Sequence, residues 1–296
     1  MSGLTSARDA ALPADNAPGM GRRRRFWRDP SATEITVVLL LTILVLFGMV
    51  YPAIYIFYGS VKVAGGVLAD TAGFTFENYV RIFQSGFGQF VVNSLFICIT
   101  ATLISTAVSV SAAYAFSRFV FRGKRLLFGA ILFGQMFPWI VLVNPLFVLF
   151  ARGGLTNSYA GMIFCYVAIS IPFSVYMLTG YLATVPKDLD EAAIIDGASR
   201  LQIVWRIIFP VMMPGIVATA TYAFLLCWTE YLFALAFLTK PDMKTLPLGL
   251  YQFFGDDSVD WGAVMAASAV TTLPTLILFL PLQSKLSAGL TAGAVK

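Results

Sequence analysis

The residues of this chain that could do chemistry are few and lie far apart. The sequence contains no histidine, and its three cysteines share no short spacing of the kind that zinc sites use. A phosphate-binding Gly-x-x-x-x-Gly-Lys-Ser/Thr run is also missing, because Arg118 stands where the glycine before Gly123 should be. We therefore expect no catalytic centre, no metal site and no ATP hydrolysis by this chain alone. The cysteines, Cys98, Cys165 and Cys227, are expected to be buried small hydrophobes.

One acidic residue, Glu230, interrupts a long apolar stretch. If that stretch crosses a membrane, an ionisable group inside it marks a water-filled route or a bonded partner. A carboxylate between aromatic rings suits a sugar, since carboxylates accept hydroxyl hydrogen bonds and rings cover the apolar face of a pyranose. The candidate residues for a path are Asn144, Trp228, Glu230 and Tyr231. A glutamate that is hydrogen-bonded to a neighbouring helix remains an equal alternative.

A second group of charged residues lies between two apolar stretches. Pro186 can start a helix, and the acidic residues that follow, Asp188, Asp190 and Glu191, suit a helix N-terminus. Gly197 suits the left-handed position that ends a helix, and Ser199 can cap a second one. The second helix would carry an apolar stripe at i, i+3, i+4 and i+7, formed by Leu201, Val204, Trp205 and Ile208. The segment predicts a helix-turn-helix on which a water-soluble partner can dock.

The composition places the chain in a bilayer. Of its 296 residues, 58% are hydrophobic and only 12% are charged. Since a spanning helix needs about 20 apolar residues, six windows qualify. They are Ile35–Tyr58, Phe90–Ser117, Leu126–Ala151, Tyr159–Ala183, Ile207–Thr239 and Trp261–Ser284. Proline predicts kinks at Pro138, Pro145, Pro172, Pro214 and Pro274.

The basic residues predict the orientation, because Lys and Arg in short loops are retained on the cytoplasmic side. Most of them fall before the first window, after the second, after the fourth and at the C-terminus: Arg8, Arg22 to Arg25, Arg28, Arg118, Arg122, Lys124, Arg125, Lys187, Arg200, Arg206, Lys285 and Lys296. Both termini and the charged segment should therefore be cytoplasmic. The net charge of +5 follows from this topology and gives no support to nucleic-acid binding.

The charged segment resembles the coupling loop of the membrane subunits of ATP-binding-cassette importers. The pattern is Glu-Ala-Ala, three residues, Gly, nine residues, then Ile-x-x-Pro, with Phe209 where that family usually has Leu. The resemblance implies that this loop docks in a cleft of a separate ATPase and carries its motion to the spans. The residues that it assigns to this coupling are Glu191, Ala192, Ala193, Asp196, Gly197, Ile207 and Pro210. An ordinary surface hairpin is the alternative.

Further segments are similar to the maltose/maltodextrin (MalG-like) type of permease subunit in the binding-protein-dependent transport family, over about residues 35–296. They are Gln135–Pro138, Trp228–Tyr231, Trp261-Gly262 and Gly289–Lys296. The resemblance implies that the tail contacts the ATPase pair through Gly289, Leu290, Thr291, Ala292 and Gly293. It also implies that an outer loop touches the solute-binding protein through Tyr251, Phe253, Phe254, Asp256 and Asp257, although a solvated connector would also fit.

The expected protein is an all-α integral membrane permease of the type I importer kind. It has a disordered cytoplasmic tail (1–34), a six-helix domain (35–288) with the coupling loop at 184–210, and a cytoplasmic C-terminal tail (289–296). The resemblance implies a bacterial cytoplasmic (inner) membrane location, a second permease subunit, two ATPase subunits that hold ATP and Mg, and an extracytoplasmic solute-binding protein. The implied substrate is an α-linked sugar such as maltose, maltodextrin or trehalose.

Two other classes compete with this interpretation. An ion-gradient-driven secondary sugar transporter tends to show inverted repeats and more charge within the membrane than one glutamate. A membrane enzyme would need a nucleophile and a base, which the sequence does not offer.

Overall fold

The computed structural model describes residues 31–63, 73–254 and 259–294, with side chains up to residue 280. The chain divides into two units, Met1–Ala53 and Ile54–Lys296, which are treated separately. In the described ranges all regular structure is helical, and β-pairing is limited to two isolated bridges, Lys62 with Phe74 and Phe254 with Val259. The helices are α1 (Ala32–Ser60), α2 (Glu77–Gln84), α3 (Phe87–Arg118), α4 (Lys124–Phe133), η2 (Gly134–Met136), α5 (Trp139–Arg152), α6 (Tyr159–Leu182), α7 (Asp188–Ile195), α8 (Arg200–Gln202), η3 (Ile203–Ile208), α9 (Phe209–Val211), α10 (Met213–Trp228), α11 (Leu232–Phe237), η4 (Pro241–Met243), α12 (Leu246–Tyr251) and α13 (Trp261–Ala294).

The helices meet the length and composition that a bilayer requires. In the described part of the chain, α1, α3, α6 and the first twenty residues of α13 are each long and apolar enough to cross a membrane. Two further pairs pass the same test but are bent, by 100° between Lys124–Met136 and Trp139–Arg152 and by 84° between Arg200–Val211 and Met213–Trp228. Counting each bent pair as one span gives six. The predicted all-helical membrane class is confirmed.

Two of the predicted windows are not continuous helices. The third breaks at Phe137 and Pro138, whose ψ angles of 131° and 123° are extended, because proline lacks an N–H and forces the residue before it out of the helical region. The fifth begins later than predicted, at Met213, and breaks again between Trp228 and Leu232. The apolar residues from Ile207 to Val211 lie instead in the short helices η3 and α9, which precede α10.

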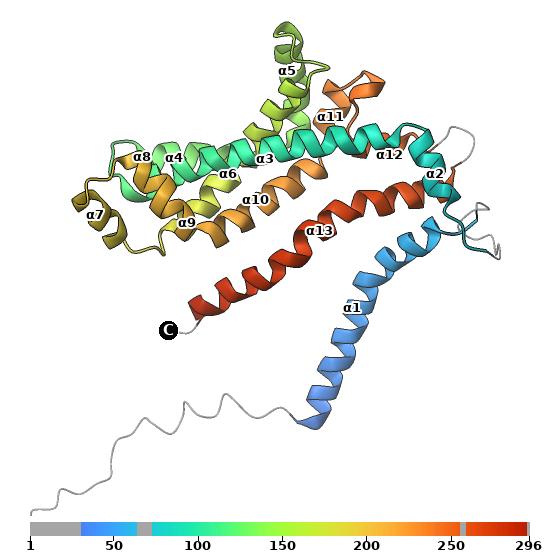
Figure 1. Cartoon of the computed structure of the whole chain (residues 1–296), viewed down its shortest axis with the longest axis horizontal. Helices are drawn as coiled ribbons and strands as arrows, with labels where there is room; N and C mark the ends of the chain where they lie inside the picture. Colours follow the sequence, from blue (N-terminus) through green and yellow to red (C-terminus); the bar gives the residue numbers. More distant parts are fainter. Residues whose placement is uncertain (1–30, 64–72, 255–258, 295–296) are drawn as a thin grey trace, which may run out of the picture. The chain divides into compact units, whose positions relative to one another are not determined.

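Helices α3, α6 and α10 pack side by side and form the core of the second unit (Figure 1). Two buried clusters lie along them. The larger contains Ile97 of α3, Tyr166 of α6 and Trp228 of α10, and it includes all three cysteines, which are free. The smaller contains Val110 of α3 and Leu178 of α6, and it continues into residues of the 184–210 loop. The predicted burial of the cysteines is confirmed.

Close approach between α6 and α10 depends on a glycine. A Cβ built on Gly215 of α10 would lie 2.5 Å from the ring of Tyr181 on α6. Gly180, on α6 itself, has no atom within 4 Å of such a Cβ. The two glycines are therefore a matched pair, in which one position is packed and the other is open.

We predict that Gly215→Ala destabilises the purified protein by about 1–3 kcal/mol, the usual cost of overpacking, although alanine is the better helix former. Gly180→Ala should be neutral or should stabilise by up to about 1 kcal/mol through helix propensity. Melting temperatures in detergent measure both effects. Equal melting temperatures for the two variants would show that α6 and α10 do not meet at Gly215.

Candidate functional site

The 184–210 loop has the local structure that its sequence predicts. Gly197 has φ = +77°, in the left-handed region. The Gly197 N–H donates to the carbonyl of Ile194, and the Ala198 N–H donates to that of Ala193, both at 3.0 Å. These two bonds form the Schellman arrangement, which satisfies the carbonyls that the end of helix α7 leaves free. The predicted left-handed cap is confirmed.

The second part of the loop begins with a capping box. The Ser199 hydroxyl accepts from the Gln202 N–H, and the Gln202 side chain accepts from the Ser199 N–H. The helix then widens into a π-helical turn, η3. This turn shifts the buried face, so that only Val204 and Ile208 of the predicted stripe are buried, together with Ile203. A stripe laid out at 3.6 residues per turn could not anticipate a segment bonded i to i+5.

The loop has one face against the spans and another that the described chain leaves uncovered. Ala193, Ile203, Val204 and Ile208 pack with residues of α3 and α6 in the smaller buried cluster. Apolar side chains on the other face are exposed, and they are Leu189 at 39%, Ile194 at 44%, Ile195 at 85%, Leu201 at 70% and Trp205 at 37%. The loop therefore exposes several large apolar side chains in addition to the face that packs on the spans.

The seven residues assigned to coupling lie in two parts of the loop. Glu191, Ala192, Ala193, Asp196 and Gly197 lie in α7 and its cap, and Ile207 and Pro210 lie in η3 and α9. Helix α7 packs against η3, so the structure brings both parts together. Ala193 is buried, Ile207 is half-buried and the other five are exposed.

A buried ion pair in this loop was not anticipated from the sequence. Arg118 Nε lies 2.9 Å from Asp190 Oδ2, and the two side chains are only 6% and 8% exposed. Removing one partner of a buried pair costs about 3–5 kcal/mol, because the remaining charge is left without water. The two residues are separated in sequence by the whole of α4, α5 and α6, and no local pattern joins them.

Glu230 lies in the break between α10 and α11 and is 5% exposed. Its carboxylate accepts three hydrogen bonds, from the N–H groups of Phe233 at 2.8 Å and Ala234 at 3.2 Å and from the Tyr166 hydroxyl at 3.1 Å. It thereby caps the first turn of α11 and joins that helix to α6. The geometry favours the alternative in which the glutamate is bonded to a neighbouring helix.

The other candidate path residues differ in burial and lie on different helices. Trp228 is buried and donates from Nε1 to the Thr271 carbonyl at 3.1 Å, Tyr231 is half-buried, and Asn144 is exposed on α5. A groove of about 530 Å³ lies between α3, α10 and α13, but none of the four candidates lines it. Its lining is apolar apart from two threonines, so it offers a sugar few hydrogen-bond partners.

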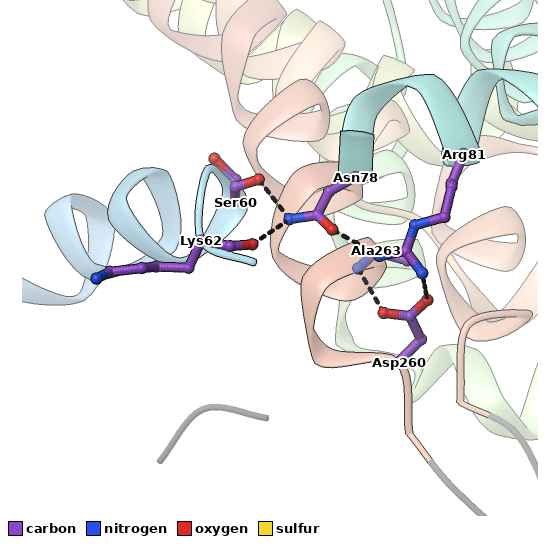
Figure 2. Close-up of polar contacts among 6 residues, drawn as sticks. All are labelled: Ser60, Lys62, Asn78, Arg81, Asp260 and Ala263. Carbon is purple, nitrogen blue, oxygen red and sulfur yellow. Dashed lines mark hydrogen bonds and ion pairs between the residues drawn. The ribbon is translucent and has the colours of Figure 1, made fainter. Parts of the chain in front are cut away.

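Polar contacts tie helix α2 to the end of α1 and to the start of α13 (Figure 2). The Asn78 side-chain amide donates to the carbonyls of Ser60 at 2.9 Å and Lys62 at 2.8 Å. Its oxygen accepts from Arg81 at 2.6 Å. Only glycine fits at position 262, because a Cβ there would lie 2.6 Å from the Asn78 oxygen.

The same network continues to the loop between α12 and α13. Arg81 pairs with Asp260 at 2.6 Å, and the other carboxylate oxygen of Asp260 accepts from the Ala263 N–H at 3.0 Å (Figure 2). Of the residues predicted to touch a binding protein, Tyr251 is 65% exposed and Phe254 is 40% exposed. Phe253 instead packs on buried Phe87, with ring centroids 5.6 Å apart. Asp256 and Asp257 lie outside the described residues.

The predicted C-terminal contact residues lie near the end of the described chain. Gly289, Leu290, Thr291, Ala292 and Gly293 lie in the last turns of α13, beyond the described side chains. The predicted tail at 1–34 lies outside the described residues up to residue 30, and α1 begins at Ala32. Within the ranges that the structure describes, no three His, Cys, Asp or Glu residues come close enough together to hold a metal ion.

Comparison with known proteins gives the family. Residues 105–291 match the family described as "Binding-protein-dependent transport system inner membrane component". The trehalose/maltose transport system permease protein MalG of Thermococcus litoralis is 38% identical over 262 residues, which cover 87% of this chain and 94% of that relative. The chain belongs to this family. The match includes Arg118, the 184–210 loop and Glu230.

Other relatives of this permease are named for the sugars trehalose and diacetylchitobiose. The trehalose transport system permease protein SugB of Mycobacterium tuberculosis is 35% identical over 90% of this chain and 99% of its own length. The diacetylchitobiose uptake permease DasC of Streptomyces coelicolor is 34% identical over 86% and 95%. A solved bacterial ABC transporter for alginate import has the same fold, with a TM-score of 0.75 and 21% identity over 87% of this chain and 99% of that chain. The permease is thus a multi-pass inner-membrane protein.

We predict that Glu230→Ala lowers the melting temperature of the permease, because three donors lose their acceptor and each unpaired buried group costs about 1–3 kcal/mol. Glu230→Gln, which keeps one acceptor oxygen, should lose less. Thr229→Ala is the matched control, since that hydroxyl is exposed and bonds only within its own helix. A Glu230→Ala permease that melts like the wild type but has an altered KM for sugar would instead place Glu230 on the path.

Proposed function

We propose that this permease is one of two membrane subunits of an ATP-driven, binding-protein-dependent carbohydrate importer. The observation that carries the proposal is the 184–210 loop, which is firmly capped and anchored but exposes Leu189, Ile195 and Leu201. Such a surface on a membrane protein fits a water-soluble partner. ATP and Mg would be held by two separate ATPase subunits, and the loop would carry their closure to the spans.

The topology supports this assignment. Arg118 and Arg122 lie at the end of α3, next to Lys124 and Arg125 at the start of α4, and Lys187 and Arg200 lie in the loop itself. Because basic residues in short loops are retained on the cytoplasmic side, their distribution supports a cytoplasmic position for the loop and both termini, where ATP is available. The opposite end, with exposed Tyr251 and Phe254, would face the solute-binding protein.

The names of several relatives support a carbohydrate substrate. Three of them are named for trehalose and maltose, for trehalose and for diacetylchitobiose, sugars that are each built from two sugar units. We propose an α-linked disaccharide or short oligosaccharide such as maltose, maltodextrin or trehalose. Because the candidate polar residues are buried or scattered, the second permease subunit would supply much of the sugar contact.

The proposed function is tested by measuring which energy source drives sugar uptake. In host cells whose own copy of the gene is deleted, the reintroduced chain should restore uptake of radiolabelled maltose or trehalose. Uptake should require ATP and should be unchanged by a proton ionophore when the ATP concentration is held constant. Diacetylchitobiose is the comparison sugar. Uptake that collapses with the ionophore at constant ATP would identify an ion-gradient-driven transporter instead.

A further inference from the structure

Helix α7 presents only two buried side chains to its surroundings. Of its eight residues, Asp190 and Ala193 are buried and lie one turn apart on the same face. Leu189, Ile194 and Ile195 are exposed. A single alanine methyl buries little apolar area, so Asp190 is the larger of the two buried side chains that attach the helix.

Asp190 is attached to the last residue of α3. Arg118 ends that helix, and its Nε lies 2.9 Å from Asp190 Oδ2. Its Nη2 also donates to the carbonyls of Val185 at 3.0 Å and Pro186 at 3.4 Å, in the chain that leads into α7. One guanidinium therefore holds both the helix and its entry segment.

The ion pair is surrounded by buried residues of α3 and of the 184–210 loop. Tyr114 lies one turn before Arg118 on α3 and is only 3% exposed. Val185 and Ala193 are in the buried cluster that includes Val110 and Tyr114 of α3. The ion pair thus lies at the edge of an apolar contact, where water has little access.

We propose that Arg118 and Asp190 form the joint through which movement of the 184–210 loop reaches helix α3. The inference rests on the proposed function and assigns two positioning residues to it, neither of which touches nucleotide or sugar. Separating a buried ion pair leaves two charges without water, which is costly. A partner that displaces α7 therefore moves α3 with it, whereas a purely apolar contact would allow the two to slide.

The test uses the complete transporter in proteoliposomes and measures the sugar transported per ATP hydrolysed. The sugar is whichever of maltose, trehalose and diacetylchitobiose the wild type transports. Asp190→Asn and Arg118→Gln complexes should keep their ATPase subunits and their basal ATP hydrolysis. Their sugar transported per ATP should fall roughly tenfold, within the range that substitutions in coupling networks produce.

Matched controls are available on the same elements. Asp188 lies in the first turn of α7, and Arg122 lies just beyond α3, and both are exposed. Asp188→Asn and Arg122→Gln should therefore transport as much sugar per ATP as the wild type. If the wild type itself transports no sugar with ATP, the proposed function is wrong. If the wild type and controls transport normally and Asp190→Asn does too, only the joint is wrong.

A double variant separates transmission from stability. Arg118→Met with Asp190→Leu replaces the pair by apolar side chains, a change that is often neutral for stability. It should recover the melting temperature that either single variant loses, but its sugar transported per ATP should stay low. Recovery of both quantities would show that the pair is only structural and would overturn the proposal. This variant also serves if a single variant fails to assemble.

Discussion

Packing of α3 against α6 is the contact on which the rest of this permease depends. The same two helices supply Ile97 and Tyr166 to the larger buried cluster and Val110 and Leu178 to the smaller one. The smaller cluster also contains the buried residues of the 184–210 loop, so the loop rests on the pair of helices that forms the core. Lipid tails are as apolar as these side chains, so the hydrophobic effect does not drive two helices together inside a bilayer. The contact between α3 and α6 therefore relies on close fit and on small residues. A displacement that the Arg118–Asp190 pair passes from the loop to α3 would therefore act on a rigid core.

A second constraint is that every backbone group in a bilayer needs a partner. The chain breaks its helices at Phe137-Pro138 and at Thr229–Tyr231, and each break leaves such groups without one. At the second break Glu230 supplies the partner, because its carboxylate accepts hydrogen bonds from the N–H groups of Phe233 and Ala234 in the first turn of α11. An acidic residue in a membrane span can therefore be explained by backbone chemistry, without a ligand. The π-helical turn at Ile203–Ile208 is a third irregularity, placed where the loop meets the fifth span.

Features set by neighbours in sequence were predictable, and features set by distant contacts were not. Gly197 and Ser199 were predicted as caps, since their chemistry acts within a few residues. The apolar windows predicted the spans. Hydropathy alone could not show that the apolar residues Ile207–Met212 lie before helix α10, which begins at Met213. Arg118 was read as a basic residue that sets orientation, and Asp190 as one that suits a helix N-terminus. Their pairing depends on how α3 and the loop pack, and that is tertiary information.

The exposed apolar side chains of the 184–210 loop are proposed to dock on a separate ATPase. The most direct measurement is affinity purification of the tagged permease from native membranes, followed by identification of the proteins that accompany it. Ile195→Asp with Leu201→Asp places charge on that face, and Val120→Asp places one on a residue that is 99% exposed outside the loop. We expect an ATPase and a second permease with the wild type and with Val120→Asp, and loss of the ATPase alone with the double variant. Recovery of the ATPase in equal amount from all three would contradict the account.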